Sequence, residues 1–194
     1  MPTPLVGDSR PDRRVADPTV SVMEFLARFR VALGWVFAPL VFILANPTRE
    51  SLLVGTIVGL AGEGVRLWAA GHLYKAREVT SSGPYRYVAH PLYVGSSIMG
   101  AGLAVASANP IAALLIAVYL VITLRAAIRN EEAFLRRTFG GEYELYRRQR
   151  VVNTARRFSL TQAVANREYR ALIGLVAAML LLAFKATYNG SFGG

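Results

Sequence analysis

Residues 91–124 read PLYVGSSIMGAGLAVASANPIAALLIAVYLVITL and contain no charged side chain. A helix that crosses the hydrocarbon core of a bilayer needs about 20 mostly apolar residues. The stretch of 34 residues is too long for one ordinary span, and Asn109 and Pro110 interrupt it near the middle. It therefore predicts two antiparallel membrane helices joined by a tight turn.

Three more apolar segments accompany this hairpin. They cover about residues 25–45, 51–73 and 171–184, the last with flanks that reach Tyr188. The chain is 54% hydrophobic and has a mean hydropathy of +0.36, which does not resemble an ordinary soluble protein. We predict an all-α, polytopic integral membrane helical bundle with about five transmembrane helices in a lipid bilayer.

Small residues recur at four-residue spacing in two of the predicted helices. Gly55 and Gly59 lie in the second segment, and the third carries a longer stripe made of Ser96, Gly100, Ala104 and Ala108. Small side chains allow two membrane helices to approach closely. Both patterns therefore predict helix packing.

The net charge of +10 first suggests nucleic acid, but the basic residues gather at the ends of the apolar segments. Cytoplasmic loops of membrane proteins carry an excess of Lys and Arg. With the amino terminus inside, 19 of the 22 basic residues lie on the cytoplasmic side. We therefore predict no nucleic acid partner. We predict a location in the plasma (inner) membrane, with the amino terminus and the active site on the cytoplasmic side. The sequence indicates no oligomeric state.

Glu63 and Arg66 lie inside the second apolar segment and need an explanation. On insertion scales each charge costs about 2.5 to 3.5 kcal/mol at a helix centre. Their i, i+3 spacing lets them pair on one face. We interpret them as a structural ion pair near the inner membrane surface, in preference to a catalytic pair.

Cysteine is absent and the two histidines lie apart in the sequence. Without thiolates, and with so few imidazoles, the chain lacks the usual ligand set of a zinc or iron centre. We therefore predict no metal.

Two polar motifs flank the hairpin on its predicted cytoplasmic side. Residues 83–95 read GPYRYVAHPLYVG, and residues 131–146 read EEAFLRRTFGGEYELY. In this order they resemble the isoprenylcysteine carboxyl methyltransferase family and its phospholipid N-methyltransferase relatives. The resemblance covers about residues 64–150 and implies a membrane methyltransferase that uses S-adenosylmethionine.

The resemblance also implies which residues bind the cofactor. In the family, residues before the Gly-Pro-Tyr strip and around His-Pro contact it, and the matching positions here are Glu78, Val79, Thr80, Tyr85, His90, Pro91 and Leu92. Pro84 and Pro91 each disfavour helix in the preceding residue, so the strip between them is predicted to be irregular. Tyr85, Tyr87 and Tyr93 offer aromatic faces for a sulfonium, although Tyr87 equally suits an interfacial aromatic belt.

The helix after the hairpin continues into charged residues. A period of 3.6 places Arg125, Arg129 and Glu132 on one stripe. We predict that Glu131 and Glu132 bind the cofactor, because carboxylates can hold its ammonium or ribose hydroxyls. Arg125 and Arg129 are the predicted catalytic residues, since arginine can grip a substrate carboxylate. The alternative is an ordinary solvated helix face.

Two positions depart from the family pattern. Ala89 stands where the family usually has the arginine of Arg-His-Pro, and Ala127 stands where a substrate-binding arginine is usual. Arg125 and Arg129 bracket Ala127, so either could substitute. The closing motif is predicted to seat the helix end rather than react; its matching residues are Phe139, Gly140, Glu142, Tyr143 and Tyr146.

These observations predict four regions. They are a flexible cytoplasmic tail (1–20), amino-terminal transmembrane helices (21–63), the methyltransferase core (64–150), and a basic connector with a terminal transmembrane helix (151–194). The predicted reaction is carboxyl O-methylation of an isoprenylcysteine-like or other lipophilic, prenylated acceptor. The alternatives are N-methylation of a phospholipid or small amine, a non-catalytic membrane interaction protein, and a sterol-reductase-like relative.

Overall fold

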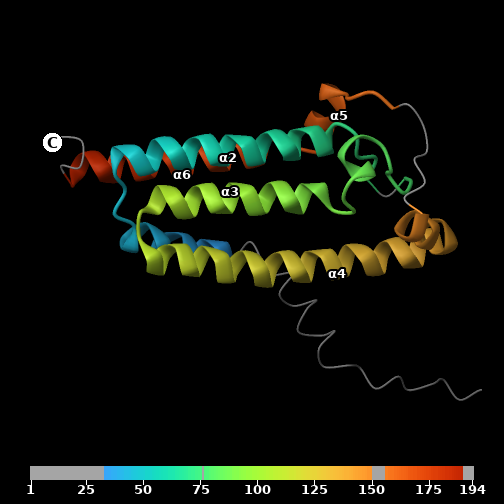
Figure 1. Ribbon diagram of the computed structural model, residues 1–194, viewed down its shortest axis with the longest axis horizontal. Helices are drawn as coiled ribbons and strands as arrows, with labels where there is room; N and C mark the ends of the chain where they lie inside the picture. The colour runs from blue at the N-terminus through green and yellow to red at the C-terminus, as the bar shows by residue number, and fades with distance from the viewer. Residues whose placement is uncertain (1–32, 76, 150–155, 190–194) are drawn as a thin grey trace, which may run out of the picture.

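The computed structural model describes residues 33–75, 77–149 and 156–189, and this part of the chain is helical with no strand. Long helices lie side by side along one axis (Figure 1). The elements are a helix at Leu33–Leu44, α2 (Arg49–Ala70), the 3-10 helix η1 (Gly83–Arg86), α3 (Pro91–Ser107), α4 (Pro110–Gln149), α5 (Leu160–Ala165) and α6 (Tyr169–Tyr188).

The helix α2 begins with a reciprocal cap. The hydroxyl of Thr48 accepts from the Ser51 amide at 3.1 Å, and the hydroxyl of Ser51 accepts from the Thr48 amide at 2.9 Å. These bonds satisfy two amides that have no partner inside the helix. The cap fixes the start of α2 two residues before the predicted segment.

Glycines bring α2 and α3 together. A Cβ built on Gly55 would lie 2.5 Å from the carbonyl oxygen of Gly102, and one on Gly62 would lie 2.5 Å from the amide nitrogen of Met99. The contact predicted for Gly55 is therefore present. The glycine of α3 that faces Gly55 and Gly59 is Gly102, which lies outside the predicted stripe; within that stripe, Gly100 packs against Leu120 of α4.

The hairpin between α3 and α4 turns where the sequence predicted. Ala108 ends α3 in the left-handed region, with φ 45°. The side-chain oxygen of Asn109 accepts from the amides of Ile111 and Ala112 at 2.9 and 3.1 Å, which caps α4. Pro110 occupies the first helical position, where its missing N–H costs nothing.

The helix α4 is broken near its carboxyl end. Gly140 has φ 44° and ψ −114°, which is not a helical conformation. Only glycine adopts this region readily, because it has no Cβ. In Figure 1 the last turns of α4 accordingly leave the axis of the preceding helix.

The helix α6 completes the bundle against α2 and α3. Its residues Leu175 and Met179 are buried, and both pack close to Gly59 of α2. They share a core with Ala45, Leu52 and Ala106. The short α5 was not predicted; it closes the end of α2.

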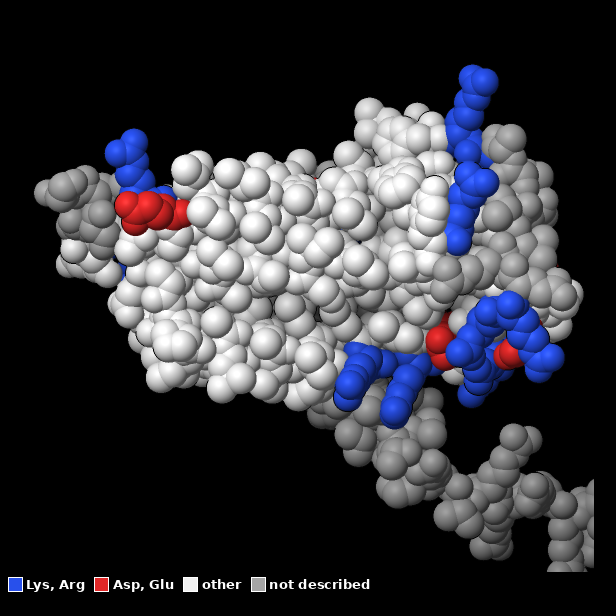
Figure 2. Space-filling view, viewed as in Figure 1, with Lys and Arg blue, Asp and Glu red and all other residues white. Residues whose placement is uncertain are grey.

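Within the described residues, length and composition qualify three helices as membrane spans, namely α2, α4 and α6, while Leu33–Leu44 and α3 are shorter apolar helices. Large apolar side chains point outward along them, and Figure 2 shows an uncharged middle with charged groups toward both ends. The predicted all-α polytopic membrane bundle is thereby confirmed. The predicted tail (1–20), the first residues of the first span (25–32) and part of the connector (151–155) lie outside the described residues.

Candidate functional site

The strip from Gly83 to His90 lies between α2 and α3 and is irregular, as predicted. A histidine packs against its first residue. Gly83 has φ +57°, and a Cβ there would lie 2.6 Å from the ring of His72. His72 is itself fixed, because its Nδ1 lies 2.9 Å from the carbonyl oxygen of Trp68 in α2. The glycine therefore serves both the backbone turn and the close approach of the imidazole. Sequence reasoning overlooked His72.

His90 meets the predicted pair of glutamates across the hairpin. Its Nε2 lies 3.4 Å from Glu132 Oε1, and its Nδ1 lies 3.8 Å from Glu131 Oε2. The imidazole is mostly buried, whereas the two carboxylates keep part of their surface exposed. Three predicted residues, 41 and 42 positions apart in sequence, thus form one cluster.

The closing motif was predicted to seat the helix end, and in the structure one of its residues also contacts the strip. The hydroxyl of Tyr146 donates to the carbonyl oxygen of Tyr85 at 2.8 Å. Tyr85 is buried. Its burial, and to a smaller extent the nearby charge of Glu131, raise the pKa of its phenol. The phenol therefore stays neutral at physiological pH. The hydrogen bond from Tyr146 to the backbone of Tyr85 attaches the strip to the far end of α4.

Two hydroxyls in this region are buried without a hydrogen-bond partner among the described residues, those of Ser82 and Tyr143. Buried polar groups are normally satisfied by protein, water or ligand. Ser82 precedes η1, and Tyr143 lies one turn before Tyr146 in α4. Partly open carboxylates and orphaned hydroxyls are a donor and acceptor set that fits a polar cofactor such as S-adenosylmethionine.

The predicted residues before the strip are held by different neighbours. Glu78 pairs with Arg156, at 2.5 and 2.8 Å, and the guanidinium of Arg156 lies 4.1 Å from the ring centre of Tyr74. The hydroxyl of Thr80 accepts from the amide of Tyr74 at 3.4 Å. Arg156 was not predicted, because nothing in the local pattern links it to Glu78. Val79 lies between them, half-buried.

The carboxyl end of α2 is closed by α5. The side-chain amide of Asn166 donates to the carbonyl oxygens of Ala70 and Leu73, both at 2.8 Å, and Gln162 donates to Leu73 at the same distance. Carbonyls at a helix end have no partner within the helix. Residues outside the predicted core thus hold the end of α2 and the start of the connection that follows it.

Arg125 lies in a groove between α3 and α4. The cavity measures about 460 Å³ and is lined by His90, Tyr93 and Arg125 together with apolar side chains. Arg125 and Arg129 are both exposed, and neither forms an ion pair within the described part of the chain. Arg129 is not among the lining residues. The geometry brings Arg125 to the His90 cluster and leaves Arg129 one turn beyond.

Pro91 and Leu92 form the first turn of α3. Pro91 is fully buried at the first helical position. The carbonyl oxygen of Leu92 accepts from the hydroxyl of Ser96 at 2.9 Å. Both residues fix the direction of α3, and they lie directly after His90.

Groups of three or more His, Cys, Asp or Glu residues that could hold a metal ion are absent from residues 33–75, 77–149 and 156–189. The predicted absence of a metal remains a prediction for the whole chain.

The fold and the site together define an integral membrane protein with a polar site at one end of a helical hairpin. Residues 54–142 match the family model described as phospholipid methyltransferase. The match contains both polar motifs up to Glu142.

Two curated proteins are similar to this chain. The nickel-cobalt-cadmium resistance protein NccN of Alcaligenes xylosoxydans xylosoxydans is 31% identical over 140 residues, covering 65% of this chain and 64% of that protein. Protein-S-isoprenylcysteine O-methyltransferase of Schizosaccharomyces pombe is 34% identical over 89 residues, covering 46% of this chain and 38% of that protein. The chain therefore spans less than two thirds of each relative. No solved structure matches it.

Proposed function

We propose that the protein is an S-adenosylmethionine-dependent membrane methyltransferase that methylates the carboxylate of a lipophilic acceptor. The observation that carries the proposal is the meeting of His90 with Glu131 and Glu132, which joins the two halves of the family motif in space. The family match supports methyl transfer. The S. pombe relative, by its name, acts on isoprenylcysteine.

The cofactor would be held by the cluster and the strip. Glu131 and Glu132 would accept from an ammonium or from ribose hydroxyls, and the hydroxyls of Ser82 and Tyr143 would offer further polar contacts. The remaining proposed cofactor-binding residues are Glu78, Val79, Thr80, Tyr85, His90, Pro91 and Leu92. When bound, S-adenosylmethionine supplies an electrophilic methyl group on a sulfonium.

The protein's own contribution is alignment and exclusion of water. A carboxylate acceptor is already nucleophilic and needs no base, so the site has to hold it in line with the methyl group. Such positioning can remove about 7 to 11 kcal/mol of a barrier. Arg125 lies in the groove beside His90 and can pair with the acceptor carboxylate through two hydrogen bonds. Arg129 is the second proposed acceptor-binding residue.

The groove favours a lipophilic acceptor. Apart from the few polar side chains near His90, its walls are aliphatic, including Val94, Leu120 and Val121. An apolar substituent gains about 25 cal/mol for each Å² of surface buried there. We place the site on the cytoplasmic face of the plasma (inner) membrane, in agreement with the basic residues at that end.

A second candidate is N-methylation of a phospholipid or small amine, favoured by the description of the matching family. An amine must lose a proton before or during transfer. His90 lies between two carboxylates and is the group best placed to receive that proton. This candidate shares the cofactor site and differs in the acceptor.

Labelled methyl transfer separates the candidates. Purified protein in lipid is given labelled S-adenosylmethionine with a prenylcysteine analogue or a total lipid extract. Base-labile label on the prenylcysteine supports carboxyl methylation, and base-stable label in the lipid supports the amine candidate. Arg125→Met should abolish the base-labile label on the prenylcysteine and leave any base-stable label in the lipid. Arg137→Met, at an exposed position in the same helix, should leave the base-labile label unchanged. Failure to bind S-adenosylhomocysteine at all would favour a non-catalytic membrane protein.

A further inference from the structure

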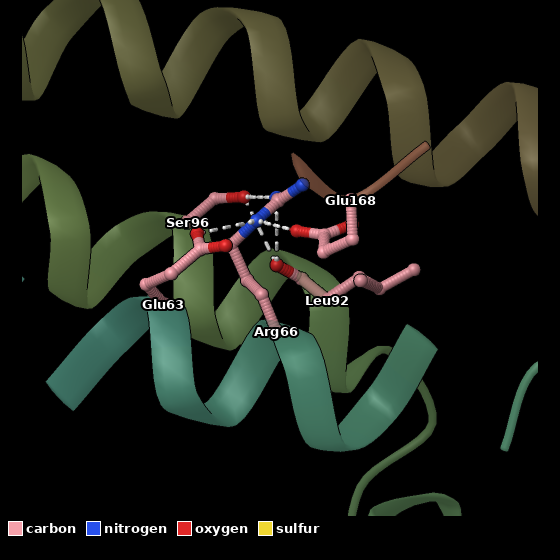
Figure 3. A network of polar contacts seen from close by, with 5 residues as sticks. All are labelled: Glu63, Arg66, Leu92, Ser96 and Glu168. Carbon is pink, nitrogen blue, oxygen red and sulfur yellow. Dashed lines mark hydrogen bonds and ion pairs between the residues drawn. The ribbon is translucent and has the colours of Figure 1, made fainter. Parts of the chain in front are cut away.

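Arg66 of α2 contacts α3 and the residue that precedes α6 (Figure 3). Its Nε lies 2.6 Å from Glu168 Oε1, just before α6. Its Nη1 donates to the carbonyl oxygen of Leu92 at 3.4 Å and also to the hydroxyl of Ser96, both in α3. The predicted pairing with Glu63 exists, but at 3.8 Å it is the longer of the two ion pairs.

The path of this side chain is built into α3. A Cβ on Gly95 would lie 2.5 Å from Arg66 Cγ and 2.7 Å from the carbonyl oxygen of Gly62. Any larger residue at Gly95 would therefore displace the arginine stem or separate the two helices. Gly95 is the last residue of the GPYRYVAHPLYVG motif, so the motif ends where Arg66 crosses α3.

The contact with Leu92 links Arg66 to the proposed site. Leu92 follows His90 by two residues and belongs to the first turn of α3. Its carbonyl oxygen accepts from both Arg66 and Ser96. The His90 ring lies within 4 Å of both Glu131 and Glu132, so a shift of this turn would change both distances.

We propose that Arg66 is a positioning residue for the methyltransferase site and that Glu168 holds it in place. The inference rests on the proposed function and extends it, since Glu168 and α6 lie outside the matched residues 54–142. The carboxyl-terminal helix then contributes to the site although it touches none of the proposed reacting groups. Arg66 acts through α3 and is not itself catalytic.

The charges support a specific role over generic packing. Arg66 is mostly buried and faces two carboxylates, and Glu63 Oε2 has no hydrogen-bond partner among the described residues. Buried ion pairs contribute little to the stability of a protein, because the cost of desolvating the charges offsets most of their attraction. Fixing one geometry is the better-supported use of such a cluster here, since the cluster joins α2, α3 and α6 at one point.

The chain contains a matched control. Lys185, at the other end of α6, donates to the carbonyl oxygens of Phe42 and Ile43 at 2.6 and 2.8 Å. It therefore docks α6 far from His90. Lys185→Met and Arg66→Met each remove one cation that fastens α6, but only the second removes the hold on Leu92.

The test compares these variants in lipid for S-adenosylhomocysteine affinity, kcat and thermal stability. Misplacement of reacting groups by about 1 Å can cost on the order of 100-fold in rate, so Arg66→Met should lower kcat by 10- to 100-fold. Arg66→Lys should not rescue it, because one ammonium cannot reproduce the fork of a guanidinium. Glu168→Gln should show a smaller loss, and Lys185→Met should keep wild-type kcat even where its thermal stability falls.

A second readout requires no catalysis. In a His72→Gln background, the remaining imidazole gives a single set of histidine NMR signals. Those signals should shift on Arg66→Met and stay in place on Lys185→Met. Unchanged signals in Arg66→Met, or an equal loss of kcat in both variants, would overturn the positioning role. If wild-type protein binds no cofactor but the shifts occur, the proposed function fails and the positioning of His90 stands.

Discussion

The two connections that flank α3 differ in how they are held. The turn after α3 consists of Ala108 and Asn109, and a single side-chain cap on α4 is enough to complete it. The connection before α3 runs over residues 71–90 and is fixed by residues from α4 and α5 as well as Arg156. Since one short turn suffices to reverse the chain, we interpret the extra contacts of the longer connection as support for the proposed cofactor site.

The largest expected effect concerns the carboxylates that meet the long connection. Glu132→Gln should weaken S-adenosylhomocysteine binding by about 10- to 100-fold, because hydrogen bonds to charged groups contribute about 1.5 to 3 kcal/mol. Isothermal titration in detergent measures the change. Glu144→Gln is the control, since Glu144 forms an exposed pair with Arg136 at 3.2 Å. Equal losses in both variants would count against a cofactor role for Glu132.

The next effect breaks the long connection at its turn. Gly83→Ala places a Cβ against the His72 ring and forces φ +57° on alanine, so we expect a loss of about 1 to 3 kcal/mol in stability, and weaker cofactor binding. Thermal unfolding followed by tryptophan fluorescence reports the first. Gly64→Ala is the control, because a Cβ there meets nothing within 4 Å. A stable, fully binding Gly83→Ala protein would contradict this account.

A third comparison concerns two tyrosines of α4, one proposed to hold the strip in place and the other proposed to contact the cofactor. Tyr146→Phe leaves a buried carbonyl of Tyr85 without its donor, which should cost about 1 to 3 kcal/mol of stability. Tyr143→Phe removes a hydroxyl that has no partner among the described residues, so stability should hold while S-adenosylhomocysteine affinity falls. Thermal shift with and without S-adenosylhomocysteine distinguishes the two. Loss of stability in Tyr143→Phe with unchanged affinity would refute its proposed contact.

The smallest effect tests the short turn. Ala108 has φ 45°, a region that costs an L-residue about 1 kcal/mol and costs glycine little. Ala108→Gly should therefore raise the thermal midpoint slightly. Cofactor affinity should not change. An altered affinity would mean that this turn also shapes the site, and the contrast between the two connections would disappear.

The membrane bundle, the hairpin and the proximity of the two motifs could be predicted from the sequence. The hairpin followed from 34 uncharged residues and one Asn-Pro break, which are local signals. The meeting of His90 with the glutamates followed from the order of the motifs, because antiparallel helices return the chain to the same end of the bundle. The site residues otherwise remain predictions about ligand contacts.

What could not be predicted involves long separations. Arg66 pairs most closely with Glu168, 102 residues away, and Glu78 pairs with Arg156, 78 residues away. Helical periodicity orders neighbours within a few turns and says nothing about such pairs. The same limit explains why Glu63 was expected to be the main partner of Arg66. His72 was overlooked because its role depends on the turn at Gly83.

The break at Gly140 divides α4 into two parts that contact different regions of the molecule. The part before it lies in the bundle, whereas the part after it carries Tyr143 and Tyr146 against the strip. A Cβ at Gly140 would meet nothing within 4 Å, so the break itself borders open space. If the proposed cofactor binds beside the strip, we expect rotation about Gly140 to move Tyr146 away from Tyr85 when the cofactor leaves, while the part of α4 in the bundle stays in place. Faster amide exchange beyond Gly140, slowed by S-adenosylhomocysteine, is the expected signature of this hinge.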